Sequence, residues 1–291
     1  MTAPAAGASP LADVAAKAGL TAIAARPPLV PYVRDLWQRR HFIVAFASAR
    51  NIATFANARL GQLWQVLTPL LNAGVYFFIF GVLLQTKRSI HNFIGFLVIG
   101  IFVFTYTQRS VISGSSSISG NLPLIRALHF PRACMPLATT IMELQQLAFS
   151  MSIMAVIVLL TGEPLTLQWL LIIPVLLLQT MFNVGAALFV ARVGARLPDV
   201  TQLLPFLIRT WLYVSGVFYS ISRFTAHSPG IVRKALEANP VLSYIELIRD
   251  ALLNGHHAAH TTWPFAIGWA VIALFGGFAV FYQGETSYGR G

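Results

Sequence analysis

Six long apolar stretches run through this 291-residue chain, and they constrain its fold more than any other feature. A bilayer core about 30 Å thick needs roughly 20 helical residues to cross it. The sequence therefore predicts an all-α polytopic membrane protein. Its six spans are expected at about 60–86, 89–112, 134–161, 166–191, 200–222 and 263–283.

The composition supports a membrane protein and argues against other classes. The chain is 56% hydrophobic and 10% charged, whereas soluble domains carry about 25% charged residues. The net charge of +11 does not indicate a nucleic-acid partner, because the basic residues lie mostly at the ends of the apolar stretches. Anionic headgroups are their natural partners there, so we expect contacts with membrane lipids and no nucleic acid.

The regions flanking the predicted six-span domain at 60–283 have different characters. Residues 1–31 lack a signal-peptide pattern and are predicted to be a disordered cytosolic leader. Residues 32–59 carry too many charges to span, so an amphipathic helix along the inner leaflet fits better. Residues 284–291 are predicted to be a short cytosolic tail, and the distribution of Lys and Arg places both termini in the cytoplasm.

Two connections carry local signals. Residues 113–135 begin with SGSSSISG and continue into a short amphipathic segment, which is either an ordinary loop or a lever that contacts a soluble partner. Residues 223–262 form the longest outer connection. Within it, Asn239 is a good N-cap and Pro240 suits the first helical position. We expect this connection to dip back into the outer leaflet or to pack over the spans.

Catalytic and nucleotide-binding signals are absent from the sequence. No GxxxxGK[ST] motif occurs, so the chain is not expected to bind ATP by a P-loop, and any energy must come from another polypeptide. The nine acidic residues make no clear acid–base pair, so we expect no enzyme and no catalytic residue. His256, His257 and His260 follow Gly255, which ends the helix, so we expect a wetted loop and no metal site. Glu143 and Arg209 lie inside predicted spans and either pair or face a polar cavity.

Four stretches, in this order along the chain, resemble the permease subunits of ABC transporters that export polysaccharides, of the O-antigen, capsule and teichoic-acid type. They are RDLWQRR (34–40) leading to LGQLWQVLTPLL (60–71), GNLPLIRALHFPRACMP (120–136), RLPDVTQLL (196–204) running to WLYVSGVFYS (211–220), and ANPVLSYIELIRDALLNG (238–255). The chain departs from the usual family pattern at Pro198-Asp199, where Arg-Asp is common, and at Gly216, where proline is common.

The resemblance implies a homodimer in the cytoplasmic membrane of a bacterium, working with two copies of a separate ATPase that holds ATP and Mg. Its cargo would be a polyprenyl-diphosphate-linked glycan, such as a cell-wall galactan or an O-antigen-like chain. The ATPase-coupling contact would lie at Asn121, Leu124, Arg126, Phe130 and Pro131. Substrate access would lie near Arg34, Arg39 and Arg40, and the outer exit near Pro229, Asn239 and Pro240.

Aromatic residues in the first, second and fifth predicted spans either contact lipid and neighbouring helices or line a transport path. A ring face offers a sugar an apolar surface without fixed hydrogen-bond geometry, so a polymer can slide past it. The candidate path residues are Tyr76, Phe104, Tyr106, Trp211, Tyr213 and Tyr219. Three other functions remain open at this stage: an exporter of a small lipophilic compound, a membrane enzyme of envelope assembly, and a passive channel.

Overall fold

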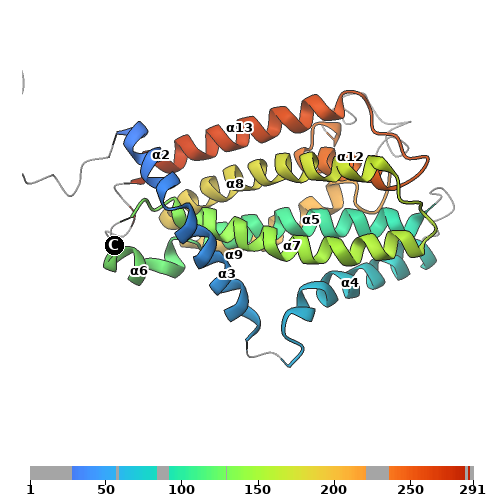
Figure 1. The fold of residues 1–291 in the computed structure, drawn as a ribbon, viewed down its shortest axis with the longest axis horizontal. Helices are drawn as coiled ribbons and strands as arrows, with labels where there is room; N and C mark the ends of the chain where they lie inside the picture. The colour runs from blue at the N-terminus through green and yellow to red at the C-terminus, as the bar shows by residue number, and fades with distance from the viewer. Residues whose placement is uncertain are drawn as a thin grey trace, which may run out of the picture.

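Long helices run side by side along one axis of the protein (Figure 1). This computed structural model describes residues 28–56, 59–83, 92–128, 130–220, 236–285 and 288, and within these ranges the regular structure is helical. Five helical stretches of the described residues are long and apolar enough to cross a membrane. They are Val66–Leu83, Phe93–Ser115, Cys134–Leu160, Leu167–Arg196 and Thr262–Gln283. Each coincides in approximate bounds with one of the predicted spans.

The first apolar stretch contains α4 (Trp64–Tyr76), which follows a 3-10 turn at Gly61–Leu63 and continues as a π-helix over Phe77–Leu83. The next two are α5 (Phe93–Ser115) and α7 (Cys134–Leu160). Between them, the 3-10 turn Ser119–Asn121 leads into α6 (Leu122–Ala127). A 3-10 turn at Leu167–Leu171 precedes α8 (Ile172–Arg196), and α13 (Thr262–Gln283) is the last helix described.

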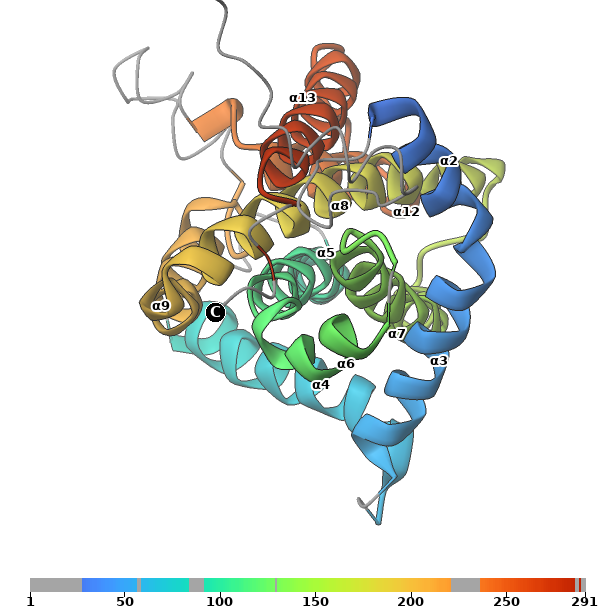
Figure 2. The same ribbon diagram turned by 90° about the vertical axis from the view of Figure 1, so that its left-hand side faces the viewer.

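Helix α5 forms the core of the bundle. Viewed from one end, it is surrounded by α4, α7, α8 and α9 (Figure 2). Its residues from Phe96 to Phe104 are all buried. A helix that is apolar all round is expected to lie inside a membrane bundle, and here the other spans shield α5 from lipid.

The fifth predicted span is shorter than expected. Helix α9 covers Pro198–Val214, 17 residues, rather than 200–222. The chain turns at Ser215 and Gly216, and Gly216 adopts a left-handed φ of 63° that glycine takes without strain. Residues 221–222 lie outside the described part of the chain.

The surface helix predicted over 32–59 is two helices, which corrects that prediction. Helix α2 covers Leu29–Gln38 and α3 covers Arg40–Phe55, with Arg39 between them at a φ of −88° and a ψ of 10°. The start at Leu29 lies inside the stretch predicted as leader, because Pro28 precedes it and fixes a backbone angle suited to a helix start. Residues 1–27 lie outside the described ranges.

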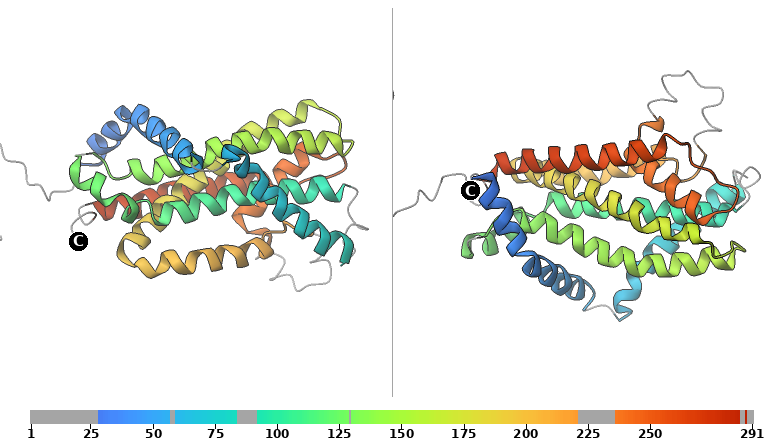
Figure 3. Two further views of the ribbon diagram at one scale, coloured as in Figure 1. Left: turned by 90° about the horizontal axis from the view of Figure 1, so that it is seen from below. Right: turned by 45° about the horizontal axis from the view of Figure 1, so that its top comes forward.

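The two ends of the bundle carry different elements. Helices α2 and α6 and the C-terminal end of α13 lie at one end, which we name the α6 end (Figures 1 and 3). Helix α12 (Pro240–Leu252) lies at the opposite end, which we name the α12 end (Figure 1). The residues following α9 reach this end too, because Ser215 Oγ accepts a 3.0 Å hydrogen bond from the side-chain amide of Asn239.

Helices α8 and α13 cross in direct backbone contact. Gly185 lies against the Ala273 carbonyl, and Gly277 lies against the Gly185 carbonyl, so neither position has room for a Cβ atom. Close approach at small residues is typical of membrane helix pairs, where packing replaces the hydrophobic effect as the source of association.

We predict that Gly277→Ala destabilises the protein and that Gly276→Ala, one residue earlier, does not. A Cβ at position 277 would overlap the Gly185 carbonyl oxygen, and such overpacking costs about 1–3 kcal/mol. A Cβ at position 276 meets nothing within 4 Å. Thermal unfolding of both variants in one detergent measures the difference, and equal melting temperatures would contradict the observed helix crossing.

Candidate functional site

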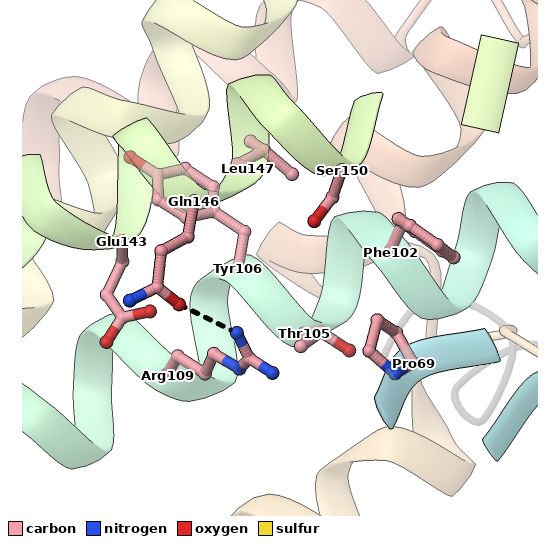
Figure 4. Close-up of a pocket in the computed structure, with 9 residues that line it drawn as sticks. All are labelled: Pro69, Phe102, Thr105, Tyr106, Arg109, Glu143, Gln146, Leu147 and Ser150. Atoms are coloured by element: carbon pink, nitrogen blue, oxygen red, sulfur yellow. Dashed lines mark hydrogen bonds between the residues drawn. The ribbon is translucent and has the colours of Figure 1, made fainter. Parts of the chain in front are cut away.

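A small polar pocket lies between α4, α5 and α7 at membrane depth (Figure 4). Its cavity of about 20 Å³ has room for one water molecule. Arg109 donates a 2.8 Å hydrogen bond to the Gln146 side chain, and Ser113 donates a 2.9 Å bond to Glu143 Oε1. Glu143 Oε2 is buried and has no hydrogen-bond partner among the described residues.

Of the two charges predicted within spans, Glu143 lines the polar pocket and Arg209 does not. Glu143 faces the polar pocket, where Arg109 is the neighbouring cation, and it forms no ion pair with Arg209. Arg209 is exposed on α9. Arg109 lies inside the second predicted span (89–112) and inside α5, and the sequence interpretation did not count it among the charges within spans.

The candidate path aromatics divide into two groups. Tyr76 and Tyr213 both pack on Phe218, with ring centroids 4.5 and 5.5 Å away, and Tyr219 donates a hydrogen bond to the Tyr213 carbonyl. Phe218 joins α4 to the end of α9 and was not a candidate.

The other path candidates make contacts of their own within the bundle. Phe104 is 1% exposed and packs edge-on against Trp211, whose indole nitrogen donates to Asn239. Tyr106 is buried and donates to Thr180 on α8. Phe104 and Tyr106 are therefore core residues of one chain and line no open surface in this conformation.

The coupling candidates meet α3 at the α6 end. Asn121 accepts a 3.3 Å hydrogen bond from Arg50, and the Phe130 ring lies 5.6 Å from that of Phe42. Helix α3 is also held to α7, because Gln145 donates a 2.8 Å bond to Ser48. The segment after α5 is therefore linked to the surface helix by two side-chain contacts.

The remaining coupling candidates vary in exposure. Arg126 is exposed on α6, Leu124 is half-buried, and Pro131 is buried beneath the start of α7. Of these three candidates, Arg126 is the exposed one.

A buried junction at Glu285 ties the two ends of the described chain together. Tyr32 on α2 donates a 2.9 Å hydrogen bond to Glu285 Oε2, and the Arg132 backbone N–H donates a 3.0 Å bond to Oε1. The Arg132 side chain also donates to the Glu285 carbonyl oxygen. Burial raises the pKa of Glu285 above its usual range. The sequence carries no signal of this junction, because Tyr32 and Arg132 lie 253 and 153 positions from Glu285.

The arginines proposed for substrate access lie on or beside α2. Arg39 pairs with Asp35 at 3.0 Å, Arg40 lies over the Trp37 ring at 5.4 Å, and Arg34 is exposed. Trp37 itself is 70% exposed. The helix therefore presents cations beside an exposed ring, an arrangement suited to the headgroup region of a bilayer.

The α12 end is organised around a buried guanidinium at Arg249. It donates hydrogen bonds of 3.0–3.2 Å to the Phe96 carbonyl, 3.0 Å to the Gly216 carbonyl and 2.9 Å to the Val217 carbonyl. It also pairs with Glu246 at 3.1 Å. Burial lowers the pKa of Arg249 to about 10, so the group remains charged at neutral pH.

Glu246 completes the Arg249 cluster from the other side. Its second oxygen lies 2.7 Å from His256 Nε2. Burial raises the pKa of Glu246, but the His256 hydrogen bond and the Arg249 charge outweigh it, so the net shift is downward. The three carbonyls that Arg249 contacts belong to α5 and the turn after α9, and the sequence analysis did not identify this cluster.

The predicted cap of α12 is confirmed. The Asn239 side chain accepts from the Val241 N–H, and Pro240 occupies the first helical position. Asn239 also accepts from Trp211 and donates to Ser215, so it joins α9 to α12. Pro229, the third exit candidate, lies outside the described residues.

We predict that Arg249→Met destabilises the protein by about 3–5 kcal/mol, because removing one partner of a buried ion pair leaves the other uncompensated. Asp250→Asn is the control. Its pairing with His257 at 3.7 Å is largely exposed, and exposed pairs contribute about 1 kcal/mol or less. Thermal unfolding in detergent measures the stability of both variants. Equal melting temperatures for Arg249→Met and the control would show that Arg249 does not stabilise the fold.

Most of the chain resembles a known family of membrane proteins. The family described as ABC-2 type transporter matches residues 43–253, from α3 to the residue after α12. The matched region thus includes the polar pocket, α6 and Arg249.

Individual relatives are permeases of bacterial export systems. The O-antigen export system permease protein RfbA of Myxococcus xanthus is 26% identical over 215 residues, which cover 74% of this chain and 81% of the relative. RfbA of Klebsiella pneumoniae is 26% identical over 202 residues, covering 69% and 76%. The polysialic acid transport protein KpsM of Escherichia coli is 25% identical over 252 residues, covering 82% and 92%.

Proposed function

The chain belongs to the ABC-2 type transporter family, and we propose that it is the membrane subunit of an ATP-driven exporter that moves a lipid-linked polysaccharide across the bacterial cytoplasmic membrane. The relatives are named for O-antigen and for polysialic acid, which are both bacterial polysaccharides. A cell-wall galactan or an O-antigen-like glycan is the cargo we favour. ATP and Mg are held by a partner ATPase, and this chain acts as a transport subunit.

Six crossings fit the chain better than five. Tyr32 near the start and Glu285 near the end are in contact, so an even number of crossings separates them. The five long spans supply five, and α9 supplies the sixth. Its 17 residues extend about 26 Å at 1.5 Å per residue, which is close to the bilayer core, and Asn239 joins its far end to α12.

The α6 end faces the cytoplasm in this proposal. Several arginines gather there: Arg34, Arg39, Arg40, Arg50, Arg126, Arg132, Arg192 and Arg196. Arg249 at the α12 end is fully buried, so it does not count as a surface charge. The positive-inside tendency supports this orientation, with both termini in the cytoplasm and α12 packed over the outer half of the spans.

Force from a partner ATPase reaches the permease through α6. Asn121 and Phe130 in the coupling segment contact Arg50 and Phe42 on α3. A displacement of α6 therefore moves α3, which begins at the access residue Arg40. This connection is the main support for the mechanism. It links the exposed α6 to the access arginines, which suit the diphosphate of a carrier lipid.

Helices α2 and α3 form the interfacial element. Exposed apolar side chains at Leu29, Val30, Val33 and Trp37 lie beside Arg34 and Arg40. Such a helix binds at the headgroup boundary, and a carrier lipid in the inner leaflet would meet it before reaching the spans.

Dimerisation accounts for the exposed faces of α4 and α9. Both helices bury few residues, and their apolar side chains remain uncovered in one chain. The exposed set includes Leu71, Val75, Phe78, Val82, Leu203, Phe206, Leu207 and Tyr213. A path between two copies would pass Tyr76 and Tyr213, which share contacts with Phe218 on this side.

Depletion of the protein in cells tests the function. We expect a polyprenyl-diphosphate-linked glycan to accumulate at the inner leaflet, because synthesis continues while export stops. Lipid extraction followed by mass spectrometry identifies it. A normal level of every lipid-linked glycan, together with loss of a small lipophilic export product, would favour the small-molecule alternative instead.

We predict that Phe130→Ala lowers glycan export at least threefold, while the assembled complex still hydrolyses ATP. The substitution removes the ring contact with Phe42 on α3. Leu128→Ala is the matched control, since Leu128 is 50% exposed in the same segment. Export and hydrolysis are measured on the same purified complexes. Export by Phe130→Ala at the control level would mean that this contact does not transmit force.

A further inference from the structure

A second pocket, of about 700 Å³, lies at the α6 end between the last turns of α8 and α13. It shares no lining residue with the polar pocket between α4, α5 and α7. Its walls come from residues of two kinds, polar and apolar: Arg192, Val193, Arg196, Leu197, Val280 and Gln283. None of these residues takes part in the coupling contacts described above.

The polar wall is basic. Arg192 and Arg196 are four residues apart on α8, so they lie on one face of the helix. Arg192 is 8% exposed, and its guanidinium lies 5.5 Å from the centre of the Tyr288 ring, which fixes its position. Arg196 is exposed and forms no ion pair with any acid in the described ranges, Asp199 included.

The other wall is apolar and continues toward the membrane centre. Val193 on α8, Leu197 just after α8 and Val280 on α13 line the pocket. One turn below Val193, Phe189 is 48% exposed. The pocket thus has cations at its rim and an uncovered apolar stripe beneath, which matches a headgroup above an acyl chain.

We propose that this pocket binds an anionic phospholipid of the inner leaflet, with its phosphate between Arg192 and Arg196 and an acyl chain along Val193 and Phe189. Guanidinium groups bind phosphate oxygens with paired hydrogen bonds. Basic pockets between membrane helices on the cytoplasmic side suit such headgroups. The choice of leaflet rests on the proposed orientation, whereas the phosphate chemistry does not.

The bound lipid would stabilise the contacts that join Arg192 to Tyr288 and to the end of α13. Arg192 contacts Tyr288, and Tyr288 stacks on Phe281 at 4.7 Å and donates to the Phe281 carbonyl. Phe281 lies in α13, four residues before Glu285 and its junction with α2 and Arg132. The lipid site would therefore support the junction without belonging to the transport path.

Native mass spectrometry of the purified permease–ATPase complex tests the proposal by titration with phosphatidylglycerol and phosphatidylcholine. We expect selective retention of phosphatidylglycerol. Arg196→Gln should weaken it about fivefold, which corresponds to about 1 kcal/mol for one basic residue near an anionic surface, and Arg196→Lys should retain most of it. Arg59→Gln removes an exposed arginine elsewhere and should change nothing.

Four results would overturn the assignment. Equal retention of the two lipids would show that the pocket does not select for charge. An equal loss of phosphatidylglycerol binding in Arg59→Gln and Arg196→Gln would show that binding is not specific to this pocket. Displacement of phosphatidylglycerol by a lower concentration of polyprenyl phosphate would assign the pocket to the carrier lipid. Displacement by inorganic phosphate alone would reduce it to a general anion site. Arg196→Gln is expected to fold, because Arg196 makes no ion pair with the described acids.

Discussion

The α12 end depends on the burial of one guanidinium. Arg249 donates hydrogen bonds to backbone carbonyls from the start of α5 and from the turn after α9. Inside a membrane such carbonyls have no water to bond, so they need a partner within the protein. Its own charge is balanced by Glu246, which His256 also contacts. Three elements that are distant in sequence thus share one hydrogen-bonded centre, and α12 is held against the spans because it carries that centre.

The α6 end is built on different contacts, and they suit movement better. This end has two single side-chain pairs, Arg50 with Asn121 and Phe42 with Phe130. The α12 end instead has a network around one fully buried residue. A transporter needs one part that holds and one part that responds to its motor. In the proposed mechanism the two ends of this bundle divide those roles, and the buried junction at Glu285 keeps α2 attached to the spans.

Hydrophobicity was sufficient to predict the long spans and their order, because about 20 apolar residues in a row have few other stable arrangements. The Asn239–Pro240 pair was sufficient to place the start of α12. The break at Arg39, the early end of α9 at Ser215 and the burial of Arg249 could not be predicted. The burial of Arg249 depends on carbonyls of Phe96, Gly216 and Val217, and α2 is held by the contact of Tyr32 with Glu285. A single sequence carries no signal for such distant pairs. The aromatic candidates show the same limit, since periodicity could not separate the buried Tyr106 from the exposed Tyr213.

The central claim is that this chain supplies a helical path and takes its energy from a separate ATPase through α6. Reconstitution in proteoliposomes with a labelled lipid-linked glycan tests it most directly, with outward movement followed by a lectin that cannot cross the membrane. The account predicts movement only when permease, ATPase and ATP are all present. Movement at the same rate by the permease alone would contradict it.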